Sequence, residues 1–300
     1  MDNTIAKLEN VKAKLENVKA KGNKTFYKVL LYIVLTLVAI VLMFPYLFMV
    51  SKSLMTSEET VDPTIRLFPA VLQFNNYVTL FVESNYLLST LHTLIIVLFN
   101  LIAVPFSASI VAFSFAKLRW KGRNFMFAIM LGTMMLPSVV TQLPLYVMFT
   151  RFGWIDTLYP FTIPNLFGGG AIYIFLIRQF MLGIPKDMDN AAKIDGANTF
   201  TRFIAITLPL CKSVLIFIMV QVFIAYWGDY YGPLMYMHSS NAPKTLAYMV
   251  FLNSTEQDSA TYMAHMRMAG GVFMSLIPAI LFSVFQKQLI EGVVMSGIKG

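Results

Sequence analysis

The stretch from Val29 to Val50, VLLYIVLTLVAIVLMFPYLFMV, decides the fold of this chain, because its 22 residues include no charged side chain. An apolar block of about 18 residues or more can cross a bilayer as a helix. A basic segment precedes the block, as in a signal peptide. The block is longer than the apolar core of a signal peptide, however, and no small-x-small cleavage site follows it. We therefore predict a retained first membrane span.

The composition of the whole chain agrees with this prediction. Of its 300 residues 57% are hydrophobic and only 13% are charged, about half the charged share of soluble domains. Prolines and a glycine run inside the third and fourth apolar blocks predict bends or close helix contacts. The predicted fold is all-α and polytopic, with six transmembrane helices at Val29–Val50, Tyr86–Phe115, Phe125–Thr150, Leu158–Ile177, Phe203–Trp227 and Gly271–Phe285.

The distribution of lysine and arginine predicts the orientation. With the N-terminus placed inside, 18 of the 23 basic residues fall on the inner side. Such a bias is the positive-inside pattern, so we expect both termini to be cytoplasmic. The same pattern explains the net charge of +8 without nucleic acid as a partner.

Two regions follow from this topology. Residues 1–28 form a basic cytoplasmic segment in which AKLENVK occurs twice, at 6–12 and 13–19. This repeat fits either an amphipathic helix on the membrane surface or a contact with a partner chain. Residues 29–300 form the membrane domain, with long outer loops at 51–85 and 228–270.

The inner loop at 185–210 is the most informative connection. Residues 184–197 read IPKDMDNAAKIDGA. Pro185 suits the first position of a helix, and Asp187 and Asp189 suit its first turn. Gly196 supplies a left-handed stop, and Asn198 or Thr199 can cap a second helix. The pattern predicts a helix-turn-helix with a small apolar face of Met188, Ala191 and Ala192. An ordinary amphipathic connector would show the same features.

The run of Ala191, Ala192, Asp195, Gly196 and Ala197, followed by Leu208-Pro209, resembles the EAA loop of ABC importer permeases. In that family the loop forms coupling helices that seat in a groove of the ATP-hydrolysing subunit. Asn190 stands where the family usually has the motif's glutamate. The resemblance implies contact with an ATPase through Asp187, Asn190, Ala191, Ala192, Asp195, Gly196 and Ala197.

Further stretches resemble the sugar-importing branch of the same family. These are FSFAKLRWKGR at 113–123, LPLY at 143–146, RQF at 178–180, WGD at 227–229 and the tail at 286–300. The tail resembles that of the smaller, maltose-type permease subunit, which reaches between two ATPases. The resemblance therefore implies a tail contact through Ser296, Gly297 and Lys299.

The resemblance also implies an assembly in a bacterial plasma membrane. A homologous second permease would complete the pathway, two cytoplasmic ATPases would hold ATP and magnesium, and an external solute-binding protein would deliver a sugar to loop 228–270. Trp227, Asp229 and Tyr230 are candidates for the substrate pathway, because aromatic faces and acids suit polyhydroxyl ligands. Trp227 could instead be an interfacial belt residue.

Three classes of function compete. A secondary carrier commonly has ionisable residues within its spans, and the six blocks hold almost none. A membrane enzyme needs a clustered acid, base or metal set, but His92, His238 and His265 are scattered without metal-ligand spacing. The chain has no Walker-type phosphate loop either. We expect a non-catalytic permease subunit with no cofactor or metal, importing an oligosaccharide or, alternatively, a non-sugar solute.

Overall fold

The computed structural model describes residues 2–62, 64, 66–82, 85–255 and 264–297, with the backbone alone for 2–26 and 287–297. Every regular element within these ranges is a helix, in agreement with the predicted all-α class. Four helical stretches in these ranges are long and apolar enough to cross a membrane, namely Tyr27–Ser53, Tyr86–Lys117, Tyr159–Leu182 and Ala264–Gln286. The number rises to six if each of two bent helix pairs is counted as one span.

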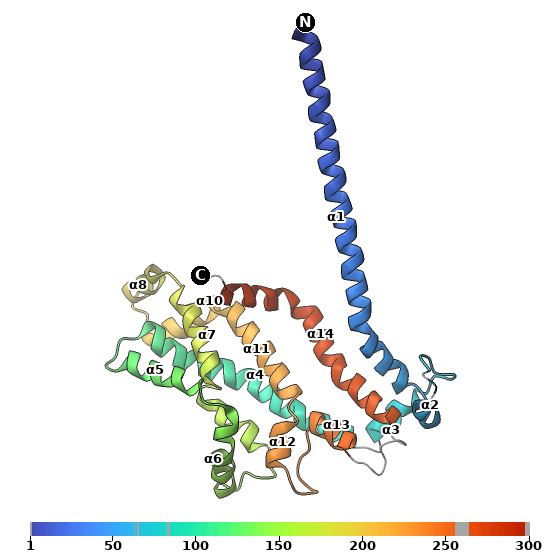
Figure 1. Ribbon diagram of the computed structural model, residues 1–300. Coiled ribbons are helices and arrows are strands. Elements are labelled where there is room, and N and C mark those ends of the chain that lie inside the picture. Colours follow the sequence, from blue (N-terminus) through green and yellow to red (C-terminus); the bar gives the residue numbers. More distant parts are fainter. Residues whose placement is uncertain (1, 63, 65, 83–84, 256–263, 298–300) are drawn as a thin grey trace.

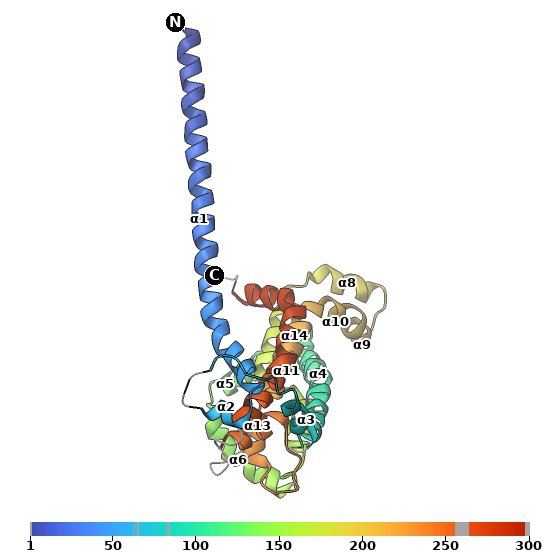
Figure 2. The ribbon, with the colours of Figure 1, turned by 90° about the vertical axis from the view of Figure 1, so that its right-hand side faces the viewer.

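The first helix, α1 (Asp2–Ser53), is continuous from the basic segment through the first apolar block. Its membrane-compatible part is Tyr27–Ser53, and the apolar 18-residue window within it has no buried residue. Figures 1 and 2 show the N-terminal half of α1 running away from all other elements. The lower part of α1 packs against α14 (Ala264–Gly297). Most of the apolar surface of α1 is therefore left for lipid or another chain.

Helix α4 (Tyr86–Lys117) is the centre of the bundle and packs against α7 (Ala171–Leu182) and α11 (Lys212–Trp227). The side chains of Ala108 and Ala112 are fully buried in the core cluster that these helices share. Such small residues let helix backbones approach closely in a membrane. The three helices thus form the packed centre of the molecule, and the elements at its two ends are connected to this centre.

The third and fourth apolar blocks are broken, as their prolines and glycines predict. Helices α5 (Arg123–Thr133) and α6 (Ser138–Arg151) meet at 98°, with Pro137 in the cap position of α6. The fourth block begins with two short 3-10 helices, η1 (Tyr159–Phe161) and η2 (Ile163–Phe167), and continues after the glycine run as α7.

Within that run Gly169 is required for two reasons. Its φ is +63°, and a Cβ at this position would lie 2.5 Å from Cγ1 of Val104 on α4. Any larger residue would therefore combine backbone strain with a steric clash.

The fifth block, predicted as one span at Phe203–Trp227, is a bent pair of helical stretches. It consists of α9 (Thr199–Thr201), a π-helix η3 (Arg202–Thr207), α10 (Leu208–Leu210) and then α11, with a 75° bend before α11. Pro209 has no N–H to donate, and π-helical turns already disturb the regular ladder. The chain therefore turns here, and the helical stretches before and after the bend are apolar enough to cross a membrane only as a pair.

The remaining helices lie in the predicted connections. Helix α8 (Lys186–Ile194) occupies the inner loop. The long outer loops contain α2 (Ser57–Val61), α3 (Asn75–Val82), α12 (Tyr231–Tyr236) and α13 (Leu246–Thr255). In both views α8 lies at one end of the bundle and α6 and α13 lie at the other.

The last helix is longer than predicted. α14 extends from Ala264 to Gly297, whereas the sequence predicted a span at Gly271–Phe285 followed by a tail. Its membrane-compatible part is Ala264–Gln286. The predicted tail region is therefore helical as far as Gly297.

Candidate functional site

Helix α8 ends in a closed turn of the kind predicted. Gly196 has a φ of +80°, and its N–H donates to the carbonyl of Lys193 at 3.1 Å. The N–H of Ala197 donates to the carbonyl of Ala192 at 2.9 Å. These two bonds form a Schellman motif, which satisfies carbonyls that the helix end would leave unpaired. Pro185 lies in the cap position, one residue before the helix, and not at the first helical position.

The second half of the helix-turn-helix begins at Asn198, one of the two predicted caps. The Asn198 side-chain oxygen accepts hydrogen bonds from the backbone N–H of Thr201 at 2.8 Å and from its hydroxyl at 3.0 Å. A side-chain acceptor at this position replaces the missing helical acceptor of the first turn. The turn between Gly196 and Asn198 is therefore fixed from both sides.

An ion pair ties α8 to the π-helix η3. Arg202 donates through Nε and Nη2 to Asp189 Oδ1 at 2.8 and 2.7 Å, and through Nη2 to Oδ2 at 2.7 Å. The Arg202 side chain is 8% exposed and that of Asp189 is 15% exposed. Lys193 Nζ lies 3.3 Å from the same carboxylate but is half exposed. This pair was not among the residues predicted from the sequence, although an acid and an arginine flanking a predicted turn were a usable signal.

The pKa of Asp189 reflects both burial and pairing. Burial raises the pKa, while the hydrogen bonds and charges of Arg202 and Lys193 lower it by more, so that the pKa lies below its ordinary value. Asp189 is therefore a carboxylate at neutral pH, and its negative charge is directed at Arg202. It is not available as a free charge for a partner.

The outward surface of α8 contains most of the predicted contact residues. Asp187, Asn190, Ala191 and Asp195 are exposed, but Ala192 is 7% exposed and points inward. Two apolar side chains near the turn stand out instead: Ile194 is 86% exposed and Phe200 is 70% exposed. Such exposed apolar side chains beside a polar helix face are typical of a protein contact. The spacing of Ile194 three residues after Ala191 could have indicated the first of them.

At the other end of α11 the three predicted pathway residues occupy different surroundings. Trp227 is 2% exposed, its ring stacks on Phe223 and its Nε1 donates to the carbonyl of Met274 at 2.8 Å. It therefore joins α11 to α14. Tyr230 is 44% exposed and stacks on Phe251 with ring centroids 4.8 Å apart.

Asp229 lies between these two aromatic residues in the sequence and closes a tight turn. Its Oδ1 accepts a hydrogen bond from the N–H of Gly232 at 2.8 Å. A Cβ at Gly232 would lie 2.5 Å from Asp229 Oδ2, so glycine allows this approach. Burial raises the pKa of Asp229, and the backbone N–H groups of Gly232 and Tyr231 oppose that effect.

The outer connections are bound to each other. Asp156, at a φ of +61°, accepts hydrogen bonds on Oδ1 from the N–H groups of His238 at 2.6 Å and Ser239 at 3.0 Å. Tyr231 contacts Gln142 of α6 through a 3.1 Å hydrogen bond. The short outer loop, α6 and the start of loop 228–270 therefore form one surface.

A buried polar network joins the broken fourth block to α4. Asn100 is fully buried, and its Nδ2 donates at 2.8 Å to the carbonyls of Ile96 and Phe161. Its Oδ1 accepts from Asn165 at 2.8 Å, and Asn165 also bonds Tyr226 of α11. Inside a membrane, free backbone carbonyls must find such partners. These residues were not among those predicted from the sequence.

The predicted tail contact lies at the limit of the described residues. Ser296 and Gly297 are in the last turn of α14. Lys299 lies outside the described residues.

The comparisons with known proteins define the class. The family described as binding-protein-dependent transport system inner membrane component matches residues 106–294. The chain belongs to this family and is a permease subunit of a binding-protein-dependent importer.

Several of its relatives are sugar permeases by name. The chain is 28% identical to the arabinooligosaccharides transport system permease protein AraQ of Bacillus subtilis (strain 168), over 91% of this chain and 96% of the relative. It is 26% identical to the maltodextrin transport system permease protein MdxG of the same organism, with the same coverage. Among solved structures, a bacterial ABC transporter involved in import of the acidic polysaccharide alginate matches with a TM-score of 0.74 and 20% identity, over 87% of this chain and 96% of that one.

Proposed function

We propose that this chain is a non-catalytic permease subunit of an ATP-driven oligosaccharide importer, and that α8 with its turn is the contact for a cytoplasmic ATPase. The observation that carries the proposal is the helix-turn-helix at the end of the bundle, closed by Gly196 and tied to η3 by Asp189 and Arg202. A homologous permease would complete the pathway, and ATP and magnesium would be held by the two ATPases.

The orientation follows from the basic residues. The N-terminus of α1 and helix α8 lie toward the same end of the molecule. That end has most of the lysine and arginine, which favours the cytoplasmic side. Six crossings, obtained if each bent pair is counted as one span, would put both termini on the same side and so support a cytoplasmic position for both.

The proposed mechanism uses α8 as a lever. Because Arg202 is at the start of η3, a displacement of Asp189 on α8 is passed to η3 and from there toward α11. Helix α11 reaches the outer end at Trp227, which is fixed to α14. Closure of the ATPases would thus move α8 and the two long helices as packed bodies, as in other rigid-body switches.

The outer end would receive the sugar. Tyr230 offers a half-exposed aromatic face, and Asp229 adds hydrogen-bond acceptors beside it. The joined outer loops provide a fixed surface for the binding protein. Trp227, being buried, would support this region through α11 and α14. The names of the relatives favour an arabino- or maltodextrin-type oligosaccharide.

The ATPase contact is tested with Gly196. In Gly196→Pro the N–H donor to Lys193 is lost, and proline cannot adopt a φ of +80°. Asparagine tolerates this region, and a Cβ at Gly196 meets nothing within 4 Å, so Gly196→Asn is the matched control. We expect uptake to be lost in the proline variant and retained in the asparagine variant, at equal membrane levels. Equal uptake by both would refute the coupling role.

A second test separates docking from folding. Ala191 is exposed and Ala192 is buried. Ala191→Trp should leave the subunit stable but reduce copurification of the ATPase, whereas Ala192→Trp should destabilise the subunit itself. Normal ATPase recovery with Ala191→Trp would place the contact elsewhere.

The substrate is tested by uptake of radiolabelled maltodextrins and arabinooligosaccharides in cells with the chain deleted and restored. ATP-independent uptake would favour a secondary carrier. Uptake of neither sugar by the complete importer would favour a non-sugar solute.

A further inference from the structure

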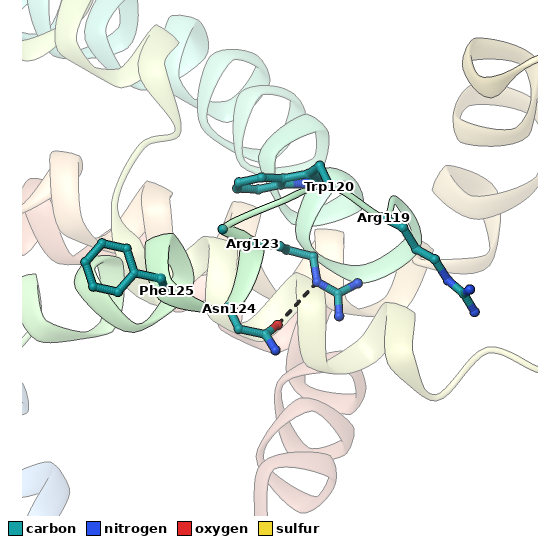
Figure 3. Close-up of a pocket in the computed structure, with 6 residues that line it drawn as sticks. Arg119, Trp120, Arg123, Asn124 and Phe125 are labelled. Carbon is teal, nitrogen blue, oxygen red and sulfur yellow. Dashed lines mark hydrogen bonds between the residues drawn. The ribbon is translucent and has the colours of Figure 1, made fainter.

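A shallow pocket lies between the end of α4 and the start of α5. Its volume is about 340 Å³. Gly122, at a φ of +85°, turns the chain tightly between the two helices. The lining residues are Arg119, Trp120, Gly122, Arg123, Asn124 and Phe125 (Figure 3). The proposed transport mechanism uses none of them.

The Arg123 side chain is held in place at this pocket. Its Nη1 donates to the carbonyl of Leu118 at 3.0 Å, and its Nε donates to Asn124 Oδ1 at 3.3 Å. In Figure 3 it lies between the side chains of Asn124 and Arg119. The Arg123 guanidinium, held in this position, keeps further N–H groups that can donate to a ligand. Arg119, four residues earlier in the chain, supplies a second guanidinium. Such groups match the oxygens of a phosphate.

The pocket has an excess of positive charge. Residues 84–155 contain no aspartate or glutamate, while Lys117, Arg119, Lys121 and Arg123 fall within seven positions. In the described part of the chain none of these four has a carboxylate within salt-bridge distance. Arg178 of α7 adds another charge nearby, with its guanidinium 3.9 Å from the ring centre of Phe127 on α5. An anionic ligand would neutralise this charge.

The surroundings favour a lipid as the source of the anion. The pocket lies at the end of a membrane-compatible helix, and Trp120, 39% exposed, is of the type that occupies the membrane interface. From the pocket an apolar strip runs along α5, with Phe125 69% and Ile129 48% exposed. These residues are four apart and share one face. An acyl chain could lie along that strip while its headgroup occupies the pocket.

We propose that this pocket binds the phosphate of an anionic phospholipid headgroup, through Arg119 and Arg123, with an acyl chain against Phe125 and Ile129. Basic pockets at the cytoplasmic ends of membrane helices bind such headgroups. Lys117, at the end of α4, donates to the carbonyl of Ile184 at 3.4 Å, just before α8. A lipid bound in the pocket would therefore stabilise the end of α4, which Lys117 connects to the segment just before α8. That it belongs to the inner leaflet rests on the orientation proposed above.

The test is native mass spectrometry of the full chain in detergent with phosphatidylglycerol, phosphatidylcholine or inorganic phosphate. We expect phosphatidylglycerol to be retained by the wild type, and Arg119→Gln to weaken its binding about fivefold, with about another fivefold for Arg119→Gln/Arg123→Gln. Arg119 makes no hydrogen bond among those found in the described residues, so the single variant should fold normally even if Arg123→Gln disturbs the turn. Arg151→Gln, outside the pocket, is the matched control and should bind like the wild type.

Three outcomes would overturn the proposal. They are equal binding of phosphatidylglycerol by Arg119→Gln and wild type, equal retention of phosphatidylcholine, and displacement of the lipid by inorganic phosphate at matched concentration. The last would assign the pocket to a soluble phosphate. Loss of ATPase copurification in Arg119→Gln with unchanged lipid binding would assign it to a protein contact. Because lipid binding is measured on the isolated chain, failure here leaves the transport proposal standing.

Discussion

The ion pair between Asp189 and Arg202 supports a quantitative prediction. Replacing Asp189 leaves the buried Arg202 guanidinium unpaired, whereas replacing Arg202 leaves a carboxylate that still has Lys193 beside it. Removing one partner of a buried pair costs about 3–5 kcal/mol. Since the Asp189 side chain keeps 15% exposure, we expect the lower end, about 3 kcal/mol, for Asp189→Asn. That variant leaves the Arg202 guanidinium, 8% exposed, without its carboxylate.

The matched variants should cost less. Arg202→Met leaves the carboxylate beside Lys193 at 3.3 Å, so we expect a loss of about 1–2 kcal/mol. Lys193→Met removes only a half-exposed pair, which is worth about 1 kcal/mol or less. Replacing both buried partners, in Asp189→Leu/Arg202→Met, should recover much of the loss because no unpaired charge stays buried.

The assay is thermal unfolding of the purified subunit in detergent, with uptake and ATP hydrolysis measured in the complete importer. For a chain of this size 3 kcal/mol corresponds to a fall in Tm of about 5 °C. We also expect less sugar imported per ATP in Asp189→Asn, since α8 is no longer tied to η3. A Tm for Lys193→Met as low as that for Asp189→Asn, or a double variant worse than either single one, would refute the reasoning.

Three other predictions concern stability. Asn100→Leu should destabilise the fold by about 1–3 kcal/mol, because it removes the buried hydrogen bonds that Asn100 donates to the Phe161 carbonyl and accepts from Asn165; an unchanged Tm would mean that these bonds contribute nothing. Gly169→Ala should lower Tm clearly, whereas Gly132→Ala, whose Cβ meets nothing within 4 Å, should not; equal Tm values would contradict the close approach to α4. Because folding lowers the pKa of Asp189, its contribution is present above the carboxyl's unfolded pKa and is lost as pH falls through the folded pKa. Acid should therefore reduce the Tm of the wild type more steeply than that of Asp189→Asn, and parallel pH profiles would contradict this.

Local signals were sufficient for the turn after α8. Gly196 predicted a left-handed residue and Asn198 a cap, and both are found. These features depend on backbone conformation within a few residues, so neighbouring residues determine them. The same holds for the break at Pro137 between α5 and α6.

Side-chain direction on α8 could not be predicted in this way. The small residues Ala191 and Ala192 look equivalent in the sequence, but only Ala192 packs inward. Which side of a short helix faces the bundle depends on the angle at which the chain returns, and the contact between Asp189 and Arg202 joins two segments across that turn. The bend before α11 likewise follows a π-helix that no sequence pattern indicated.

The sequence by itself determined that the chain is a helical membrane protein with a helix-turn-helix between its fourth and fifth apolar blocks, because apolar block length and capping residues act locally or through the bilayer. Only the tertiary structure decided that Trp227 is buried against α14, that Asn100 bonds the broken fourth block, and that Arg119 and Arg123 line one pocket. Each of these depends on residues far apart in the chain or on the exact path of a turn. Tertiary packing brings these residues together, and no local sequence pattern indicates how they pack.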